Sequence, residues 1–178
     1  MNNLYPLVHR ELNEQFNLIE VLKWGSLPKI YHYKDDNDKA QYLRAYALTY
    51  LKEEITAEQI VRKLNPFRQF LEVAAQSNSK IINYSKIATD INVDTKTVQS
   101  YFNILEDTLI GIILPTYHLS LRKRQRMNPK FYFFDLGVKR ALERTLNIDI
   151  QEGTYAFGEA FEHFIILECM KLASYFSL

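Results

Sequence analysis

Five polar side chains that follow Asp94 have the types and spacing that suit contact with nucleic acid. Asp94 is a favourable N-cap, and apolar residues recur after it at steps of three and four, so the segment predicts an amphipathic helix. The polar residues expected on its solvent face are Thr95, Lys96, Gln99, Ser100 and Asn103. Their hydroxyl, ammonium and amide groups can hydrogen-bond base edges and phosphates. The segment is therefore a candidate DNA-contacting helix.

A shorter helix is expected just before this one. Ile87, Ala88 and Ile91 place apolar groups on one helical face, and Val93 lies in the turn between the helices. The apolar face expected for the second helix consists of Val98, Tyr101, Phe102 and Leu105. Two short helices joined by a few residues are typical of a helix-turn-helix. An ordinary helical hairpin is the alternative that fits the same pattern.

Two short strands are expected after the helix pair, at 109–115 and 131–134, because both runs are rich in apolar residues that favour strands. Ile81 and Ile82 can add a short strand that pairs with them. The basic residues between the two strands are Arg122, Lys123, Arg124, Arg126 and Lys130. A helix-turn-helix followed by a hairpin predicts a winged helix, whose basic wing would meet phosphates. A solvated hairpin that carries basic residues for solubility is the alternative.

Several other kinds of chemistry are missing from the sequence. No glycine precedes a Lys-Ser or Lys-Thr pair, so there is neither a phosphate loop nor a dinucleotide fingerprint. The four histidines lack metal-ligand spacing, and a single cysteine, Cys169, does not support a structural zinc site. We therefore expect no cofactor in this chain and no complete active site.

Two acids lie on the long helix predicted from Tyr155 to Phe176. Glu168 falls in the middle of the arc formed by Phe157, Phe161, Phe164, Ile165, Leu172 and Tyr175. Glu162 falls at the edge of that arc, beside Cys169. An acid on an apolar face is either paired with a base or functional. We expect Arg140 or Arg144 to pair with Glu168.

Four further helices and two loops complete the expected organisation. The helices are placed at 18–24, 40–54, from Asn65 onward and at 139–146, and the loops at 31–39 and 147–154. Asn65 is the expected N-cap of the third helix, with Pro66 at its first position.

The composition of the chain limits the classes of protein to which it can belong. The chain has 178 residues, of which 47% are hydrophobic, and a formal net charge of +1, so attraction to nucleic acid must come from a local patch. There is no apolar run long enough to span a bilayer and no signal-peptide pattern at the N-terminus. A single cysteine suits a reducing compartment, and we expect a cytoplasmic protein without a membrane partner.

Five separated motifs, taken in order, carry a resemblance to a known family. They are Gly25–Pro28, Tyr46–Ile55, Tyr101–Gly111, Pro129–Val138 and Gly158–Glu168. Together they resemble the C-terminal portion of prokaryotic AAA-type ATPases of the archaeal-ATPase-like group, which carry a domain of unknown function after the ATPase core. The motifs are spread over nearly the whole chain.

The resemblance implies an ATPase module that comes first, then a winged helix beginning near Asn65, then a restriction-endonuclease-like fold beginning near Gly153. ATP and magnesium are expected for the ATPase module, which this sequence lacks. Glu162 matches the helix glutamate of the nuclease fold, but the Asp and Glu-x-Lys of its strands have no counterpart. Glu162 is therefore expected to be a vestigial acid, and the chain to be a fragment that is not itself an enzyme.

These observations predict a mainly α-helical fold with a small β-sheet. The expected parts are a helical region at 1–64, a winged helix at 65–146 and the first helix of a truncated nuclease-like α/β domain at 147–178. The expected function is that of an accessory region of an AAA-type ATPase, with a winged helix that contacts duplex DNA. The alternatives are a protein-interaction or homo-oligomerisation module of that ATPase and the remnant of a metal-dependent nuclease.

Overall fold

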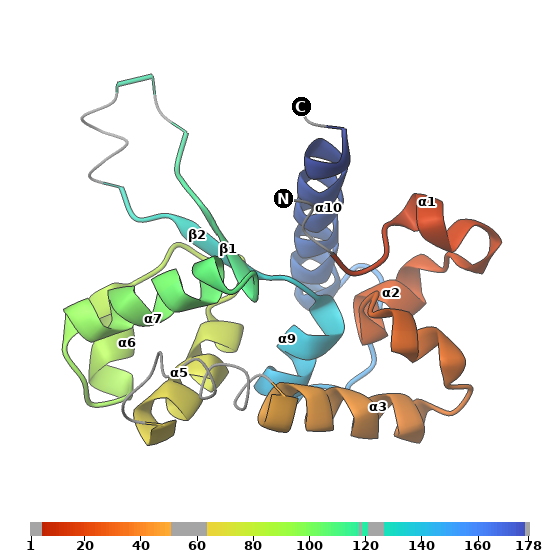
Figure 1. Ribbon diagram of the computed structural model, residues 1–178, viewed down its shortest axis with the longest axis horizontal. Helices are drawn as coiled ribbons and strands as arrows, with labels where there is room; N and C mark the ends of the chain where they lie inside the picture. The colour runs from red at the N-terminus through yellow and green to blue at the C-terminus, as the bar shows by residue number, and fades with distance from the viewer. Residues whose placement is uncertain (1–4, 51–63, 118, 121–126, 177–178) are drawn as a thin grey trace. The chain divides into compact units, whose positions relative to one another are not determined.

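A computed structural model describes residues 5–50, 64–117, 119–120 and 127–176 of the chain. The described part is mainly helical with one small antiparallel sheet, as predicted (Figure 1). The chain divides into two compact units, one formed by residues 1–48 and 134–178 and the other by residues 49–133. We call them unit 1 and unit 2 and describe each by itself.

Unit 1 is built from helices at both ends of the chain. Its elements are α1 (His9–Leu12), η1 (Asn13–Gln15), α2 (Leu18–Trp24), η2 (Pro28–His32), α3 (Asp36–Ala45), α9 (Leu136–Glu143) and α10 (Tyr155–Tyr175), and a π-helical segment, η3 (Tyr46–Tyr50), continues α3. Helix α9 contacts α2, α3 and α10, which makes it the central element of the unit (Figure 1).

The contact between α9 and α2 is unusually close at Gly137. A Cβ atom at this position would lie 2.1 Å from the backbone oxygen of Trp24, so only glycine permits the approach. Val21, Leu22, Leu43, Val138 and Leu142 are buried around it and form the core of the unit.

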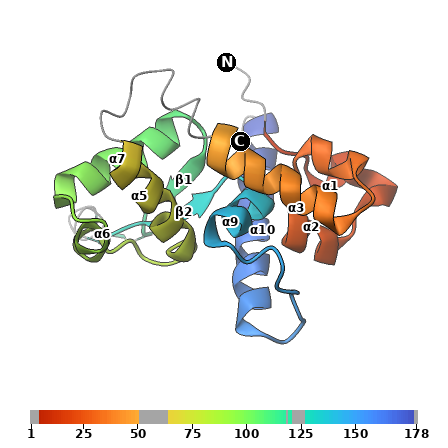
Figure 2. The ribbon, with the colours of Figure 1, turned by 90° about the horizontal axis from the view of Figure 1, so that it is seen from below.

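Within its described residues, unit 2 contains three helices and two strands. Its elements are α5 (Leu64–Gln76), α6 (Tyr84–Asp90), α7 (Thr95–Asp107), β1 (Gly111–Leu114) and β2 (Lys130–Phe133). The three helices contact one another, and α7 also contacts β1 (Figure 2). Strands β1 and β2 pair antiparallel, with Gly111 opposite Phe133 and Leu114 opposite Lys130. Ile81 forms an isolated bridge to Lys130, which confirms the expected third pairing.

Several expected boundaries differ from the structure. The loop predicted at 31–39 contains the end of η2 and the start of α3, since the Asp35 carboxylate accepts a hydrogen bond from the Asn37 amide and caps that helix. Helix α9 begins at Leu136 instead of Lys139 because Asp135 is its N-cap. Helix α5 begins at Leu64, so Asn65 lies inside it instead of capping it. Residues 51–54 of the predicted 40–54 helix lie outside the described residues.

The two units also divide the chain differently from the expected winged helix at 65–146. Unit 2 ends at Phe133, whereas Asp135 and α9 belong to unit 1. Within unit 1, the Asp135 carboxylate accepts a hydrogen bond from the Ser26 amide.

Within the described ranges, no helix is both long and apolar enough to cross a membrane.

Candidate nucleic-acid interface

The pair α6 and α7 is held by local capping at each start. The Asn83 side chain accepts a hydrogen bond from the Lys86 amide at the start of α6, at 3.0 Å. The Asp94 carboxylate accepts from the Thr97 amide at 2.9 Å and from the Thr97 hydroxyl at 2.6 Å. The hydrogen bond from the Thr97 hydroxyl contributes most to lowering the pKa of Asp94 below its ordinary value, and the bond from the Thr97 amide lowers it further. Asp94 is therefore ionised at neutral pH and stabilises the N-terminus of α7.

The turn between these helices has a specific backbone shape. Asn92 adopts a φ of 53°, in the left-handed region that asparagine tolerates better than most residues. The Val93 amide donates to the Ala88 carbonyl at 3.0 Å and closes the turn. The chain therefore reverses between α6 and α7 in four residues, 91–94.

An aromatic cluster fixes the inner face of α7. The ring of Phe102 lies 4.8 Å from that of Phe70 on α5 and 5.0 Å from that of Phe131 on β2, measured between centroids. Tyr101 lies 5.0 Å from Phe67. The residues predicted to be buried on α6 and α7 are all buried, namely Ile87, Ala88, Ile91, Val98, Tyr101, Phe102 and Leu105. Aromatic burial on this scale sets the rotation of α7 about its axis.

The outer face of α7 follows from that rotation. All five residues singled out from the sequence, Thr95, Lys96, Gln99, Ser100 and Asn103, are exposed. The structure therefore brings them together on one helical surface. That they contact DNA stays a prediction.

Helix α7 ends in a tight cap that leads directly into β1. The Ile110 amide donates to the Leu105 carbonyl at 2.8 Å and the Leu109 amide to the Glu106 carbonyl at 3.0 Å. Leu109 itself has a φ of 59°. This pair of bonds is the Schellman arrangement, which turns the chain sharply. It brings β1 against α7.

The hairpin is attached to the end of α5 by backbone and side-chain bonds. The Ser79 amide donates to the Phe131 carbonyl at 2.9 Å, and the Ile82 amide to the Pro129 carbonyl at 2.9 Å. The buried Asn78 side chain accepts from the Phe133 amide at 2.8 Å. The strands are therefore fixed relative to the helices of unit 2. The basic residues Arg122, Lys123, Arg124 and Arg126 between them lie outside the described residues.

Formal charge differs between the two units. In unit 2, twelve Lys and Arg residues stand against eight Asp and Glu, which gives +4. In unit 1, ten stand against thirteen, which gives −3. The small net charge of the whole chain is therefore the sum of an excess of positive charge in unit 2 and an excess of negative charge in unit 1.

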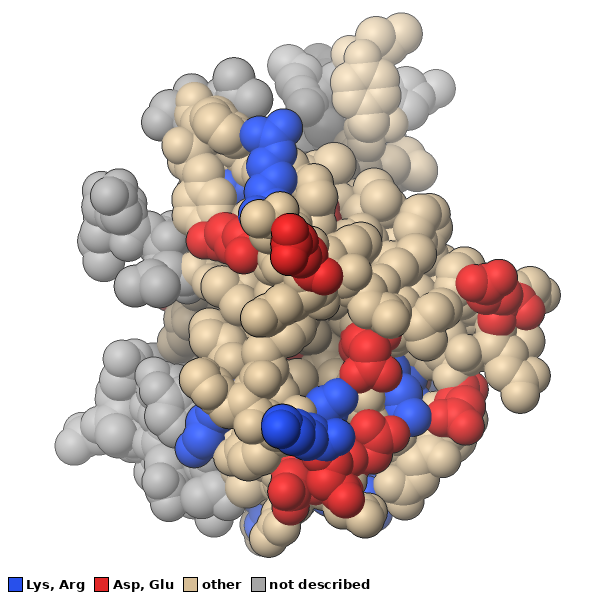
Figure 3. Space-filling view, turned by 90° about the vertical axis from the view of Figure 1, so that its right-hand side faces the viewer, with Lys and Arg blue, Asp and Glu red and all other residues tan. Residues whose placement is uncertain are grey.

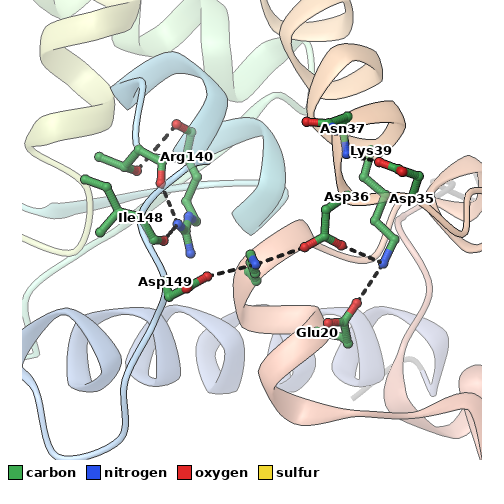
Figure 4. A network of polar contacts seen from close by, with 10 residues as sticks. Glu20, Asp35, Asp36, Asn37, Lys39, Arg140, Ile148 and Asp149 are labelled. Carbon is green, nitrogen blue, oxygen red and sulfur yellow. Dashed lines mark hydrogen bonds and ion pairs between the residues drawn. The ribbon is translucent and has the colours of Figure 1, made fainter.

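Two lysines of unit 1, Lys23 and Lys39, are paired with acids. Lys23 Nζ lies 2.9 Å from Asp149 and 3.1 Å from Asp36, and Lys39 Nζ lies 2.7 Å from Glu20 (Figure 4). Figure 3 shows basic and acidic side chains interspersed on the face that it presents. The charges of these two lysines are therefore compensated within the unit.

The two acids of α10 that the sequence singled out, Glu162 and Glu168, lie in different surroundings. Glu162 is exposed, whereas Glu168 is buried. Among the described residues, no three His, Cys, Asp or Glu side chains are grouped so that they could hold a metal ion.

The prediction that Arg140 or Arg144 pairs with Glu168 was wrong. Its Oε2 atom lies 2.6 Å from His9 Nδ1 and accepts from the His9 amide at 3.1 Å. Arg140 instead bonds the loop after α9, where its Nη2 donates to the carbonyls of Thr145 and Ile148 (Figure 4). Arg144 is exposed and ends α9. The arc of apolar residues on α10 is only partly buried, since Phe161, Ile165 and Tyr175 are exposed. A helix that is apolar most of the way round gives no unique buried face from which a partner of Glu168 could be predicted.

Sequence reasoning missed a polar cluster in the core of unit 1. Asp135 is fully buried and accepts from the amides of Ser26 and Val138, at 2.7 and 3.0 Å. Lys171 is buried beside it and donates to Ser26 Oγ at 3.3 Å. Burial raises the pKa of Asp135 and lowers that of Lys171. The signal for Asp135 was present in its position before Leu136, where an N-cap belongs, but nothing local indicated Lys171.

Comparison with known proteins gives a family and no activity. The chain is 25% identical over 151 residues to the uncharacterized proteins Rv2008c of Mycobacterium tuberculosis and Mb2031c of Mycobacterium bovis. The match covers 83% of this chain and 34% of each relative, so the chain spans about a third of their length. No solved structure matches it. Residues 15–151 match a family described as a domain of unknown function, DUF8612, and the chain belongs to that family.

Proposed function

We propose that residues 65–133 act as a winged helix that contacts duplex DNA, with α7 as the helix that enters the major groove. The observation that carries the proposal is the exposed polar face of α7, held outward by the aromatic cluster beneath it. Helix α6, the turn, α7 and the β1–β2 hairpin follow one another in the order of a helix-turn-helix with a wing. Helices of this kind place their polar N-terminal residues against base edges.

The charge of unit 2 supports the same proposal. Its formal charge of +4 equals the contribution of the four basic connector residues, Arg122, Lys123, Arg124 and Arg126, since the remaining charges of the unit cancel. A local excess of positive charge attracts phosphates and supplies much of the affinity for DNA without specifying sequence.

We propose further that this DNA contact serves a protein related to the AAA-type ATPases, in which nucleotide and magnesium would be bound outside the present sequence. The five ordered motifs support that relation. In that arrangement the chain acts as an accessory region without catalytic residues of its own.

A salt series of duplex binding tests the proposal. The purified chain is titrated into a labelled duplex at several salt concentrations, and the slope of log affinity against log salt is compared with that of Arg122→Ala/Arg124→Ala. Each lost phosphate contact should reduce the slope by about 0.9. The matched control is Lys29→Ala/Lys34→Ala, which removes the same charge from exposed positions of unit 1 and should leave the slope unchanged.

A protein partner is the second candidate. Tyr117 and Leu119, near the hairpin, have exposed fractions of 82% and 88%, which suits docking to an apolar surface. An equal slope for the connector variant and for the unchanged chain, or no binding to duplex, would favour this candidate.

A further inference from the structure

The exposed face of α7 carries two side-chain amides on one line along the helix. Gln99 and Asn103 are four residues apart, and Lys96 precedes them by three. All three are exposed and, within the described ranges, make no side-chain hydrogen bond or ion pair. On α6, by contrast, the hydroxyl of Ser85 donates to Asn83 and that of Thr89 donates to the Ser85 carbonyl. In the part of the chain that the structure describes, the side-chain amides of α7 therefore hold no other element in place.

The chemistry of a side-chain amide fits one base best. Glutamine and asparagine each present a donor and an acceptor side by side, and adenine presents the complementary pair, the N6 amino group and N7, in the major groove. Four residues of α-helix rise about 6 Å, and base pairs stack at about 3.4 Å. Gln99 and Asn103 are therefore spaced to meet adenines about two base-pair steps apart.

The acids of α7 fix which end of the helix approaches the DNA. Glu106 and Asp107 are exposed at the C-terminal end, where they would repel phosphates. Asp94, at the other end, uses both carboxylate oxygens on Thr97. Lys96 is the exposed cation of α7, and it lies in the first turn. The N-terminal two-thirds of α7, from Lys96 to Asn103, is therefore the part that suits the groove.

We infer that unit 2 selects duplex DNA containing two adenines about two base-pair steps apart, which Gln99 and Asn103 recognise through their side-chain amides. The inference rests on the proposed DNA contact and adds its sequence preference. Thr95 and Ser100 carry hydroxyls, which can bond several bases and so add affinity without choosing among them.

Selection from a random duplex library, followed by affinity measurements on the enriched sequence, tests the inference. The purified chain should enrich adenine at two positions about two steps apart. Replacing either adenine by 7-deazaadenine, which lacks the N7 acceptor, should weaken binding roughly tenfold. In each of the variants Gln99→Ala and Asn103→Ala, one of the two 7-deazaadenine substitutions should no longer weaken binding. Gln69→Ala, an exposed amide on α5, is the control and should keep both effects.

The outcomes separate the preference from the DNA contact itself. Salt-dependent binding without adenine enrichment, or 7-deazaadenine penalties that persist in both variants, overturns the inference and leaves the proposed function standing. Absence of binding to any duplex overturns both. Circular dichroism of the variants checks that α7 is retained, as expected because alanine favours the helix.

Discussion

The carboxylate of Asp135 accepts a hydrogen bond from the backbone amide of Ser26 at 2.7 Å, across 109 residues of sequence. Its other oxygen accepts from the Val138 amide and caps α9. One buried side chain therefore fixes both the start of the central helix and the loop that follows α2. Gly25 permits this contact, since a Cβ there would lie 2.2 Å from an Asp135 oxygen.

Asp135→Ala should lower the free energy of unfolding by about 2 to 4 kcal/mol, because two buried amides and Lys171 lose an acceptor or a charge partner. Urea denaturation followed by circular dichroism measures the change. Asp149→Ala, which removes an exposed partner of Lys23, is the control and should lower the free energy of unfolding far less than Asp135→Ala does. Equal effects in the two variants would contradict a special role for Asp135.

Lys171→Met should change how stability depends on pH. Burial lowers the pKa of Lys171 in the folded chain below its ordinary value of 10.5, so the folded state binds fewer protons than the unfolded state between the two values. The stability of the unchanged chain should therefore rise relative to Lys171→Met as pH increases through that window towards 10.5.

Denaturation curves collected at successive pH values, in parallel for both proteins, give this difference directly. A flat difference would show that the pKa of Lys171 is the same in the folded and unfolded chain, and a difference that falls with rising pH would show a raised pKa in the folded chain; either result contradicts the prediction.

Local sequence signals predicted unit 2 well because its contacts are mostly between neighbouring elements. The caps Asn83 and Asp94 and the apolar spacing of α6 and α7 lie within a few residues of the groups they serve. Unit 1 was predicted less well, since its buried polar groups meet partners from the other end of the chain. Glu168 and His9 are separated by 159 residues, and nothing in the spacing of either segment indicates the other.

Glu168→Gln should lower the free energy of unfolding by about 1 to 3 kcal/mol, because the buried carboxylate loses its charge-assisted bond to His9. A double-mutant cycle with His9→Ala isolates that contact. Glu152→Gln is the exposed control on the loop before α10 and should be neutral. Additive effects of the two changes would mean that the pair contributes nothing as a pair.

Magnesium-dependent cleavage of DNA should be absent from this chain. Such chemistry needs several oxygen ligands around the metal, and Glu162 on α10 is exposed without a neighbouring group of metal-binding side chains among the described residues. Incubation of plasmid with the purified protein and magnesium is the measurement. Cleavage that disappears in Glu162→Ala would restore the nuclease interpretation.

Two glycines of unit 1 should respond in opposite directions to alanine. At Gly137 the added Cβ would meet the Trp24 backbone oxygen at 2.1 Å, so α9 must move away from α2. Overpacking of this kind costs about 1 to 3 kcal/mol, and the emission of Trp24, the single tryptophan, should shift as its surroundings open. At Gly158, on α10, an added Cβ meets nothing within 4 Å. Gly158→Ala should therefore stabilise the chain by about 0.5 to 1 kcal/mol through helix propensity alone. Because both changes add the same methyl group to a helix, a neutral Gly137→Ala would contradict the close packing of α9 on α2, and a destabilised Gly158→Ala would contradict the open space beside Gly158.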